Sequence, residues 1–121
     1  DVCSSDLIAT AGQIAANVKK LARETYNREI LVFGQGYIVC RDTEEEAIAY
    51  RDKYVRENGD WEGVRNLLDT LVPNSESALG DGWESMAANL IAGYGAIPLV
   101  GTPDQVDRTL EAMAQALEEA A

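Results

Sequence analysis

Histidine is missing from this chain of 121 residues. Its absence removes the commonest general base of enzymes and the commonest nitrogen ligand of zinc. Cysteine is scarce as well, and Cys3 and Cys40 are too few for a disulfide framework. Any catalysis would therefore come from carboxylates, tyrosines, a thiol or a bound cofactor, and we expect no metal centre.

Positive charge is also scarce. Lysine and arginine number 10 against 21 aspartates and glutamates, which gives a formal charge of -11. Nucleic acids and anionic membrane surfaces both attract clustered cations, so this balance argues against either partner. No apolar run approaches the roughly 20 residues of a membrane-spanning helix, and no secretory signal is visible. We expect a cytoplasmic protein.

The first seven residues, Asp1 to Leu7, are unusual for a protein start. They lack an initiating Met and match the translation of a common sequencing adapter. In one interpretation residues 1–7 are not native, Cys3 has no function, and the natural chain continues upstream. In the other, Ser4 to Asp6 form a genuine polar cap before the first helix.

Two long segments carry the clearest patterns. The segment Glu29 to Cys40 is too continuously apolar for a half-exposed strand, and it predicts a central strand buried on both faces. Alternation places Gln35 and Tyr37 on the same face of that strand. The segment from Ile8 to about Tyr26 has helical spacing. It predicts a helix with one buried stripe: Ala11, Ile14, Ala15, Val18, Leu21 and Ala22.

The rest of the chain predicts helices, one loop and one short apolar run. Thr43, Asp60 and Thr102 are expected to cap helices, and two capping boxes are expected, one of Thr102 with Gln105 and one of Thr43 with Glu46. The composition of Asn74 to Gly82 predicts a mobile loop. The predicted elements are a helix from Glu44 to about Glu57, a helix from Trp61 that ends before Pro73, a helix from Trp83 to Ala92, a strand-like run before Gly101, and a helix after Pro103.

Only one of these segments is a convincing strand. A buried parallel strand needs hydrogen-bond partners for its backbone on both sides, which the rest of the chain does not supply. The sequence therefore predicts an α/β protein of which this chain is one piece.

Three stretches of the chain carry a family resemblance. They are Ile38 to Ala47, Gly59 to Gly63 followed by Val72 to Ser75, and Ala92 to Gly95 followed by Pro98 to Pro103. Together they resemble the luciferase-like flavin-dependent monooxygenases, and the second and third are similar to the dimethyl sulfone monooxygenase branch of that family. The resemblance covers roughly Ile8 to Gln115.

The resemblance implies a (β/α)8 TIM barrel, which takes about 250 residues. Residues 8–121 would be its C-terminal portion, with one full barrel strand, several helices and a short apolar strand-like piece, and would be inactive alone. The family oxygenates small organosulfur compounds with molecular oxygen and reduced FMN, which a separate NAD(P)H-dependent flavin reductase supplies. The parent protein would be a cytoplasmic homo-oligomer.

The resemblance also implies a substrate site at the C-terminal ends of the barrel strands. Related alkanesulfonate monooxygenases place an arginine and a histidine where this chain has Gln35 and Tyr37, which favours a neutral sulfone over an anionic sulfonate. These two residues are the substrate-binding candidates, and the alternative is that they are ordinary barrel-interior residues. Pro73 to Trp83 is a candidate lid. Trp61, Trp83 and Tyr94 are expected to be packing residues.

Two further hypotheses stay open. The chain could be a non-catalytic, small α/β interaction module that binds no flavin. It could also belong to a deazaflavin-dependent oxidoreductase of the same superfamily, which differs in the reduced cofactor that the complete enzyme retains. Flavin contacts are expected on the strands that this chain lacks, so the sequence assigns none.

Overall fold

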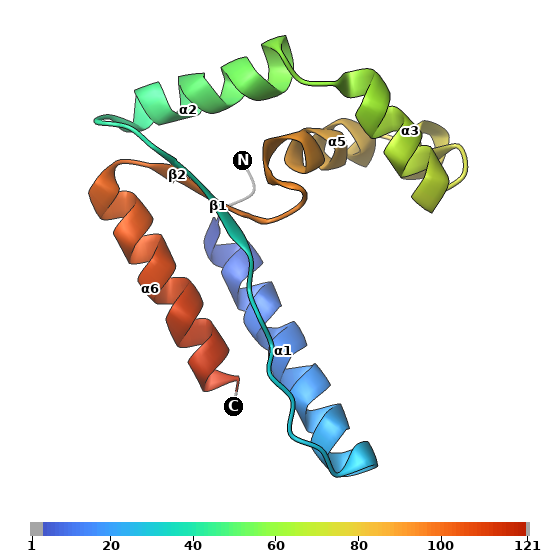
Figure 1. Ribbon diagram of the computed structural model, residues 1–121, viewed down its shortest axis with the longest axis vertical. Coiled ribbons are helices and arrows are strands. Elements are labelled where there is room, and N and C mark those ends of the chain that lie inside the picture. Colours follow the sequence, from blue (N-terminus) through green and yellow to red (C-terminus); the bar gives the residue numbers. More distant parts are fainter. Residues whose placement is uncertain (1–3, 121) are drawn as a thin grey trace.

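A computed structural model describes residues 4–120 and shows a mixed, helix-rich α/β architecture (Figure 1). Residues 1–3, with Cys3, and residue 121 lie outside the described part. The elements are α1 (Ser4–Tyr26), β1 (Gly36–Cys40), α2 (Glu44–Asp52), the π-helical turn η1 (Lys53–Glu57), α3 (Trp61–Leu71), α4 (Ser75–Leu79), α5 (Gly82–Gly93), β2 (Ile97–Gly101) and α6 (Pro103–Glu119).

The two strands pair in parallel, with Gly36 opposite Ile97 and Cys40 opposite Gly101. Parallel strands need a long crossover, and the segment from α2 to α5 supplies it. Figure 1 shows α2 and α5 on one side of the strands and the packed pair α1 and α6 on the other. Helices thus cover both faces of this small sheet, and two strands alone do not form a barrel wall.

The strand predicted from Glu29 to Cys40 is mostly wrong. The chain becomes a strand only at Gly36, and the preceding residues are irregular. Leu31 and Phe33 are 84% and 87% exposed, and Ile38 within β1 is 55% exposed. The reason is long-range: β2 is only five residues long, and among residues 4–120 no third strand pairs with the outer edge of β1.

The first predicted helix is confirmed, but it is longer and less buried than expected. It begins at Ser4, so Ser5 and Asp6 lie inside the helix rather than forming a separate cap. Ile8, Ala15 and Ala22, spaced seven residues apart, are buried. Three members of the predicted buried stripe are instead exposed because nothing in the described chain packs over them: Ile14, Val18 and Leu21.

The predicted caps are confirmed. Thr102 Oγ1 accepts the backbone N–H of Gln105, and Gln105 Oε1 accepts the backbone N–H of Thr102, which completes the capping box of α6. Thr43 caps α2 and Asp60 caps α3 in one direction only, because each side chain accepts the backbone N–H three residues later. The capping box predicted for Thr43 and Glu46 is therefore only half formed. Gln105 also donates from Nε2 to Glu44 at 3.0 Å, so the starts of α6 and α2 are joined.

The end of α2 widens into η1, which the sequence did not predict. The N–H of Asn58 bonds to the carbonyl of Lys53, five residues back, as a π-helical turn requires. The indole N–H of Trp61 donates to the Val55 carbonyl at 3.0 Å. This bond fixes the angle at which the chain enters α3.

The predicted loop from Asn74 to Gly82 is also wrong, because it contains α4. Ser75 is fully buried, and a small core of Val64, Leu68, Trp83 and Ala87 holds α3 and α5 together beside it. Composition indicated a loop because Ser, Gly and Asp are typical of turns. The tertiary hydrogen bonds of the buried Ser75 to Asp69 and Trp83 hold the segment in place despite that composition. No helix within residues 4–120 has the length and apolar character needed to cross a bilayer.

Candidate functional site

The two substrate-binding candidates occupy different environments. Gln35 is exposed and lies just before β1, where its carbonyl accepts the N–H of Ile97 at 3.0 Å. Tyr37 is half-buried within β1, and its ring lies directly against Gly93 at the end of α5. No hydrogen bond in the described chain joins the two side chains, and only Tyr37 is held by a neighbouring element.

Arg51 of α2 holds the Tyr37 hydroxyl in place. Its Nε donates to the Tyr37 oxygen at 2.7 Å, and its Nη2 donates to Asn89 Oδ1 of α5 at 3.2 Å. The ion pairs of residues 4–120 leave Arg51 without a carboxylate partner. A half-buried guanidinium held by two neutral acceptors keeps its charge and its remaining N–H donors available for a polar ligand.

Sequence reasoning missed Arg51, because its contact with Tyr37 depends on how α2 packs against the sheet. Ala47 is fully buried in α2, and a residue four positions later lies on the same helix face, toward the sheet. The inference of a neutral substrate rested on the lack of a permanent charge at Gln35 and Tyr37. Because Arg51 brings such a charge to Tyr37 from another element, that inference loses its basis.

Further tyrosines lie next to this cluster. Tyr54 donates to the Ala92 carbonyl at 2.9 Å, and its ring meets that of Tyr50 edge-on at 5.8 Å. The Arg41 guanidinium stacks over Tyr50, 3.9 Å from the ring centre. Burial raises the pKa of Tyr54 above its usual 10.0, with Tyr37 as the next cause, so Tyr54 stays protonated at neutral pH. This cluster can hydrogen-bond a ligand, but Tyr54 is not a general base.

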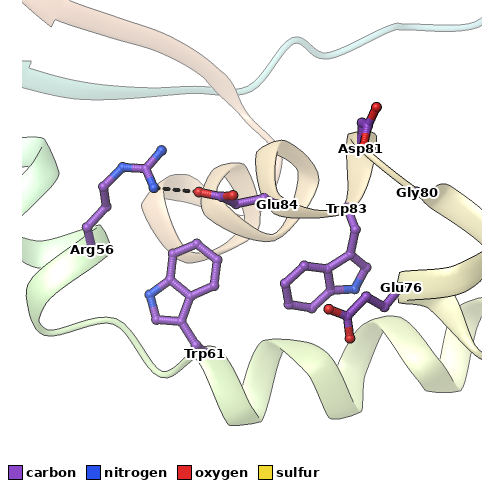
Figure 2. A pocket seen from close by; sticks show the side chains of 7 residues that line it. All are labelled: Arg56, Trp61, Glu76, Gly80, Asp81, Trp83 and Glu84. Carbon is purple, nitrogen blue, oxygen red and sulfur yellow. Dashed lines mark hydrogen bonds and ion pairs between the residues drawn. The ribbon is translucent and has the colours of Figure 1, made fainter.

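A cavity of about 560 Å³ lies between η1 and the α3–α5 unit. Figure 2 shows its side chains, with the rings of Trp61 and Trp83 facing the same space and the Arg56–Glu84 ion pair across its rim at 2.8 Å. Trp83 is buried in the small core, as expected of a packing residue. Tyr94 was expected to pack as well, but it is 72% exposed because it ends α5 in a left-handed turn.

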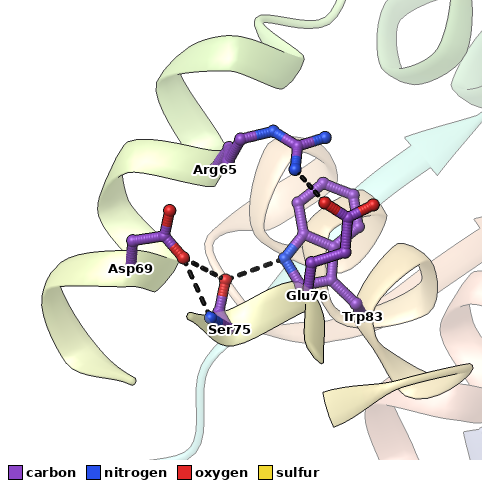
Figure 3. A network of polar contacts seen from close by, with 5 residues as sticks. All are labelled: Arg65, Asp69, Ser75, Glu76 and Trp83. Atoms are coloured by element: carbon purple, nitrogen blue, oxygen red, sulfur yellow. Dashed lines mark hydrogen bonds and ion pairs between the residues drawn. The ribbon is translucent and has the colours of Figure 1, made fainter. Parts of the chain in front are cut away.

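A polar network stabilises one wall of this cavity (Figure 3). The Ser75 hydroxyl donates to Asp69 Oδ1 at 2.7 Å and accepts the indole N–H of Trp83 at 3.0 Å, while the Ser75 backbone N–H donates to the same Asp69 oxygen at 2.9 Å. The Ser75 hydroxyl, followed by the backbone bond, lowers the pKa of Asp69 below its ordinary value. These bonds connect α3, α4 and α5.

Three cavities among residues 4–120, including an open one of about 340 Å³ beside Arg108 of α6, lack the features of an FMN site. A flavin needs a largely enclosed apolar slot with a few polar groups, one of them for the phosphate. The cavity of about 560 Å³ is open and carries three carboxylates, and its one arginine is already paired. An apolar space between α1 and α6 measures only about 10 Å³. Within residues 4–120, no three potential metal ligands converge either.

Comparison of the chain with protein-family models, with curated proteins and with solved structures gives no match.

Proposed function

We propose that this chain is the C-terminal portion of a (β/α)8 barrel. The complete protein would be a reduced-FMN-dependent, two-component monooxygenase acting on a small organosulfur compound, with molecular oxygen as co-substrate. The family resemblance of three stretches supports this proposal. So does the strand-then-helix order of β1 with α2 and β2 with α6. The chain alone would be inactive.

The observation that carries the proposal is the unpaired edge of β1. Leu31 and Phe33 precede β1 in a continuously apolar run, yet both are more than four-fifths exposed. An exposed apolar strand edge is a liability that proteins normally cover. A neighbouring barrel strand would extend β1 toward Glu29 and cover these side chains. In a barrel, helices cover only the outer face of the sheet. The proposal therefore also requires that, in the complete protein, either α2 and α5 or α1 and α6 leave their face of the sheet to other barrel strands.

Within this proposal, the chain supplies polar contacts to the substrate rather than flavin contacts. The Tyr37 hydroxyl and the Arg51 guanidinium would bind substrate oxygen atoms, since both offer hydrogen bonds in a half-buried place. Gln35 is exposed and would face the same substrate once a neighbouring strand orders it. No step of the flavin chemistry is assigned to these residues.

The genomic sequence upstream of Ile8 provides the first test. We expect an open reading frame with several further strand–helix units, and an authentic start codon immediately before Ile8 would refute the proposal. The complete gene product, given reductase and NAD(P)H, is expected to consume oxygen in a sulfone- or sulfonate-dependent manner with reduced FMN. A requirement for reduced deazaflavin instead would move the protein to the other branch of the superfamily. Light scattering is expected to show a homo-oligomer.

The isolated chain provides an independent test. Titration of FMN with the 121-residue chain is expected to leave flavin fluorescence unquenched, because none of the three cavities found among residues 4–120 encloses a flavin. Tight stoichiometric binding would contradict the proposal. The competing interaction-module hypothesis also predicts no flavin binding, so folding behaviour must separate the two hypotheses. The interaction module requires a cooperatively folding monomer, whereas an aggregating product with Leu31 and Phe33 exposed agrees with a barrel fragment.

A further inference from the structure

The cluster of Tyr37, Arg51 and Asn89 joins β1, α2 and α5. Figure 1 shows α2 and α5 on the same side of the strands, and Arg51 bridges the two helices through its bonds to the Tyr37 hydroxyl at 2.7 Å and to Asn89 Oδ1 at 3.2 Å. The Tyr37 ring lies against Gly93, and all three members of the cluster are half-buried. Arg51 and Asn89 lie outside the three stretches that carry the family resemblance, so the resemblance does not assign this cluster.

The hydrogen-bonding groups that stay free in this cluster are mostly donors. Arg51 uses one N–H for Tyr37 and one for Asn89, and its remaining N–H groups have no acceptor among residues 4–120. The hydroxyl hydrogen of Tyr37 has no acceptor in that part of the chain either. Free N–H and O–H donors beside a positive charge fit a ligand that only accepts hydrogen bonds, and an oxyanion is such a ligand.

The positive charge of Arg51 has no carboxylate partner, although the chain has 21 aspartates and glutamates. The ion pairs of residues 4–120 belong to Arg56 and Arg65. An arginine that only joined two helices would be held more firmly by a carboxylate at position 89, because charged acceptors make stronger hydrogen bonds. The neutral amide of Asn89 instead fixes the guanidinium and leaves its charge available.

We propose that Tyr37 and Arg51 bind the oxyanion of a small organic acid, a carboxylate or a sulfonate. The oxyanion accepts the free N–H groups of Arg51 and the hydroxyl hydrogen of Tyr37. Asn89 is a positioning residue that orients the guanidinium without neutralising it. The inference rests on the proposed function for the substrate-binding role of Tyr37 and Arg51, and it adds the charge of the group that they bind.

A matched pair of ligands tests whether charge is recognised. Dimethyl sulfone is the neutral isostere of methanesulfonate, since a methyl group replaces one oxygen. The 121-residue chain is titrated with each ligand at constant ionic strength, and the backbone amide resonances of Tyr37, Arg51 and Asn89 are followed by NMR. Saturable shifts at these positions are expected with methanesulfonate only. No saturable shift, or an equal response to the sulfone, would overturn the proposal.

Two amide-to-acid substitutions separate anion binding from the joining of helices. Asn89→Asp places a carboxylate against Arg51, and competition by this internal ion pair is expected to weaken methanesulfonate binding about fivefold. The free energy of unfolding should not fall, because Arg51 keeps an acceptor at position 89. Asn17→Asp is the control, since Asn17 is exposed on α1 and its Oδ1 accepts one side-chain hydrogen bond, from Gln13 at 3.0 Å.

The control makes the same change of net charge and is expected to leave methanesulfonate binding unchanged. Equal affinities of the wild type and Asn89→Asp, or equal losses in both variants, would refute the role of the Arg51 charge. Urea denaturation of both variants shows whether the loss of binding occurs without a loss of stability.

A third variant and a third ligand complete the test. Tyr37→Phe removes the hydroxyl but keeps the ring, and it is expected to weaken binding about two- to tenfold, as loss of one hydrogen bond does. Unchanged affinity would contradict the role of the hydroxyl. Acetate then distinguishes the two kinds of acid: tighter binding of acetate indicates a carboxylate ligand, and tighter binding of methanesulfonate indicates a sulfonate. Either result supports the proposal, and binding of neither contradicts it.

The complete gene product separates failure of this inference from failure of the proposed function. If methanesulfonate does not bind while oxygen uptake with reduced FMN depends on a sulfone, the anion site is refuted and the monooxygenase proposal stands. If Asn89→Asp weakens anion binding but no organosulfur compound supports oxygen uptake, the anion site stands and the monooxygenase proposal is refuted.

Discussion

The buried hydroxyl of Ser75 allows a quantitative test of the α3–α5 unit. In Ser75→Ala, the indole N–H of Trp83 loses its acceptor, and Trp83 is only 7% exposed, so water does not readily replace the hydroxyl. An orphaned buried donor costs about 1–3 kcal/mol. Water can replace the Ser75 hydroxyl as a donor to the solvent-exposed Asp69 carboxylate. The loss of stability therefore comes from the unpaired indole N–H of Trp83. We expect the free energy of unfolding to fall by about 1–3 kcal/mol, roughly a 5- to 150-fold change in the unfolding constant.

Urea denaturation followed by circular dichroism measures this loss, and Ser77→Ala is the matched control. Ser77 belongs to the same helix α4 but is exposed, so its removal is expected to change the free energy of unfolding by less than about 0.5 kcal/mol. In a Trp83→Phe background no indole N–H remains to be orphaned, and Ser75→Ala should then cost clearly less. Equal costs for Ser75→Ala and Ser77→Ala, or equal costs in both backgrounds, would refute the reasoning.

Two further predictions concern acid stability and packing. In the folded protein the pKa of Asp69 lies below its ordinary value of 3.8. The ionised carboxylate therefore stabilises the folded state at pH values above 3.8, and this stabilisation is lost as the pH falls through the lower pKa of the folded state. Between about pH 5 and pH 2, urea midpoints of the wild type should therefore fall more than those of Asp69→Asn; parallel curves would contradict this. Gly93→Ala places a methyl group into the Tyr37 ring and should destabilise by about 1–3 kcal/mol. Gly82→Ala, at the open start of the same helix, should be neutral or stabilising, and similar losses in both would be the refuting result.

Local sequence signals predicted local structure well. Thr102, Pro103 and Gln105 lie within four residues of one another, and the capping box that they predicted is present in full. The predicted caps Thr43 and Asp60 are also present, because a cap depends only on a side chain and a backbone N–H three residues away. The number and order of the helices followed from such signals, apart from α4 and the π-helical turn.

Features that depend on distant residues were not predictable in this way. The length of β1 depends on β2, about sixty residues later, so the apolar run before Gly36 could not show that it lacks a partner. Burial of Ser75 requires Asp69 and Trp83 on two other helices. The contact of Arg51 with Tyr37 requires α2 to fold back along the strand. In each case the type of residue was visible in the sequence, whereas its partner was set by tertiary packing.

The π-helical turn η1 has a consequence for the length of the chain. A π-helical turn holds one residue more than the α-helix around it, so the segment Lys53–Glu57 is a place where the backbone could lose a residue and still continue as a helix. Each residue of an α-helix turns the following side chains by about 100°. The loss would therefore swing Arg56 away from Glu84 and withdraw the Val55 carbonyl from Trp61. The number of residues in this single turn thus sets whether Arg56 reaches Glu84 across the cavity and whether Val55 holds Trp61.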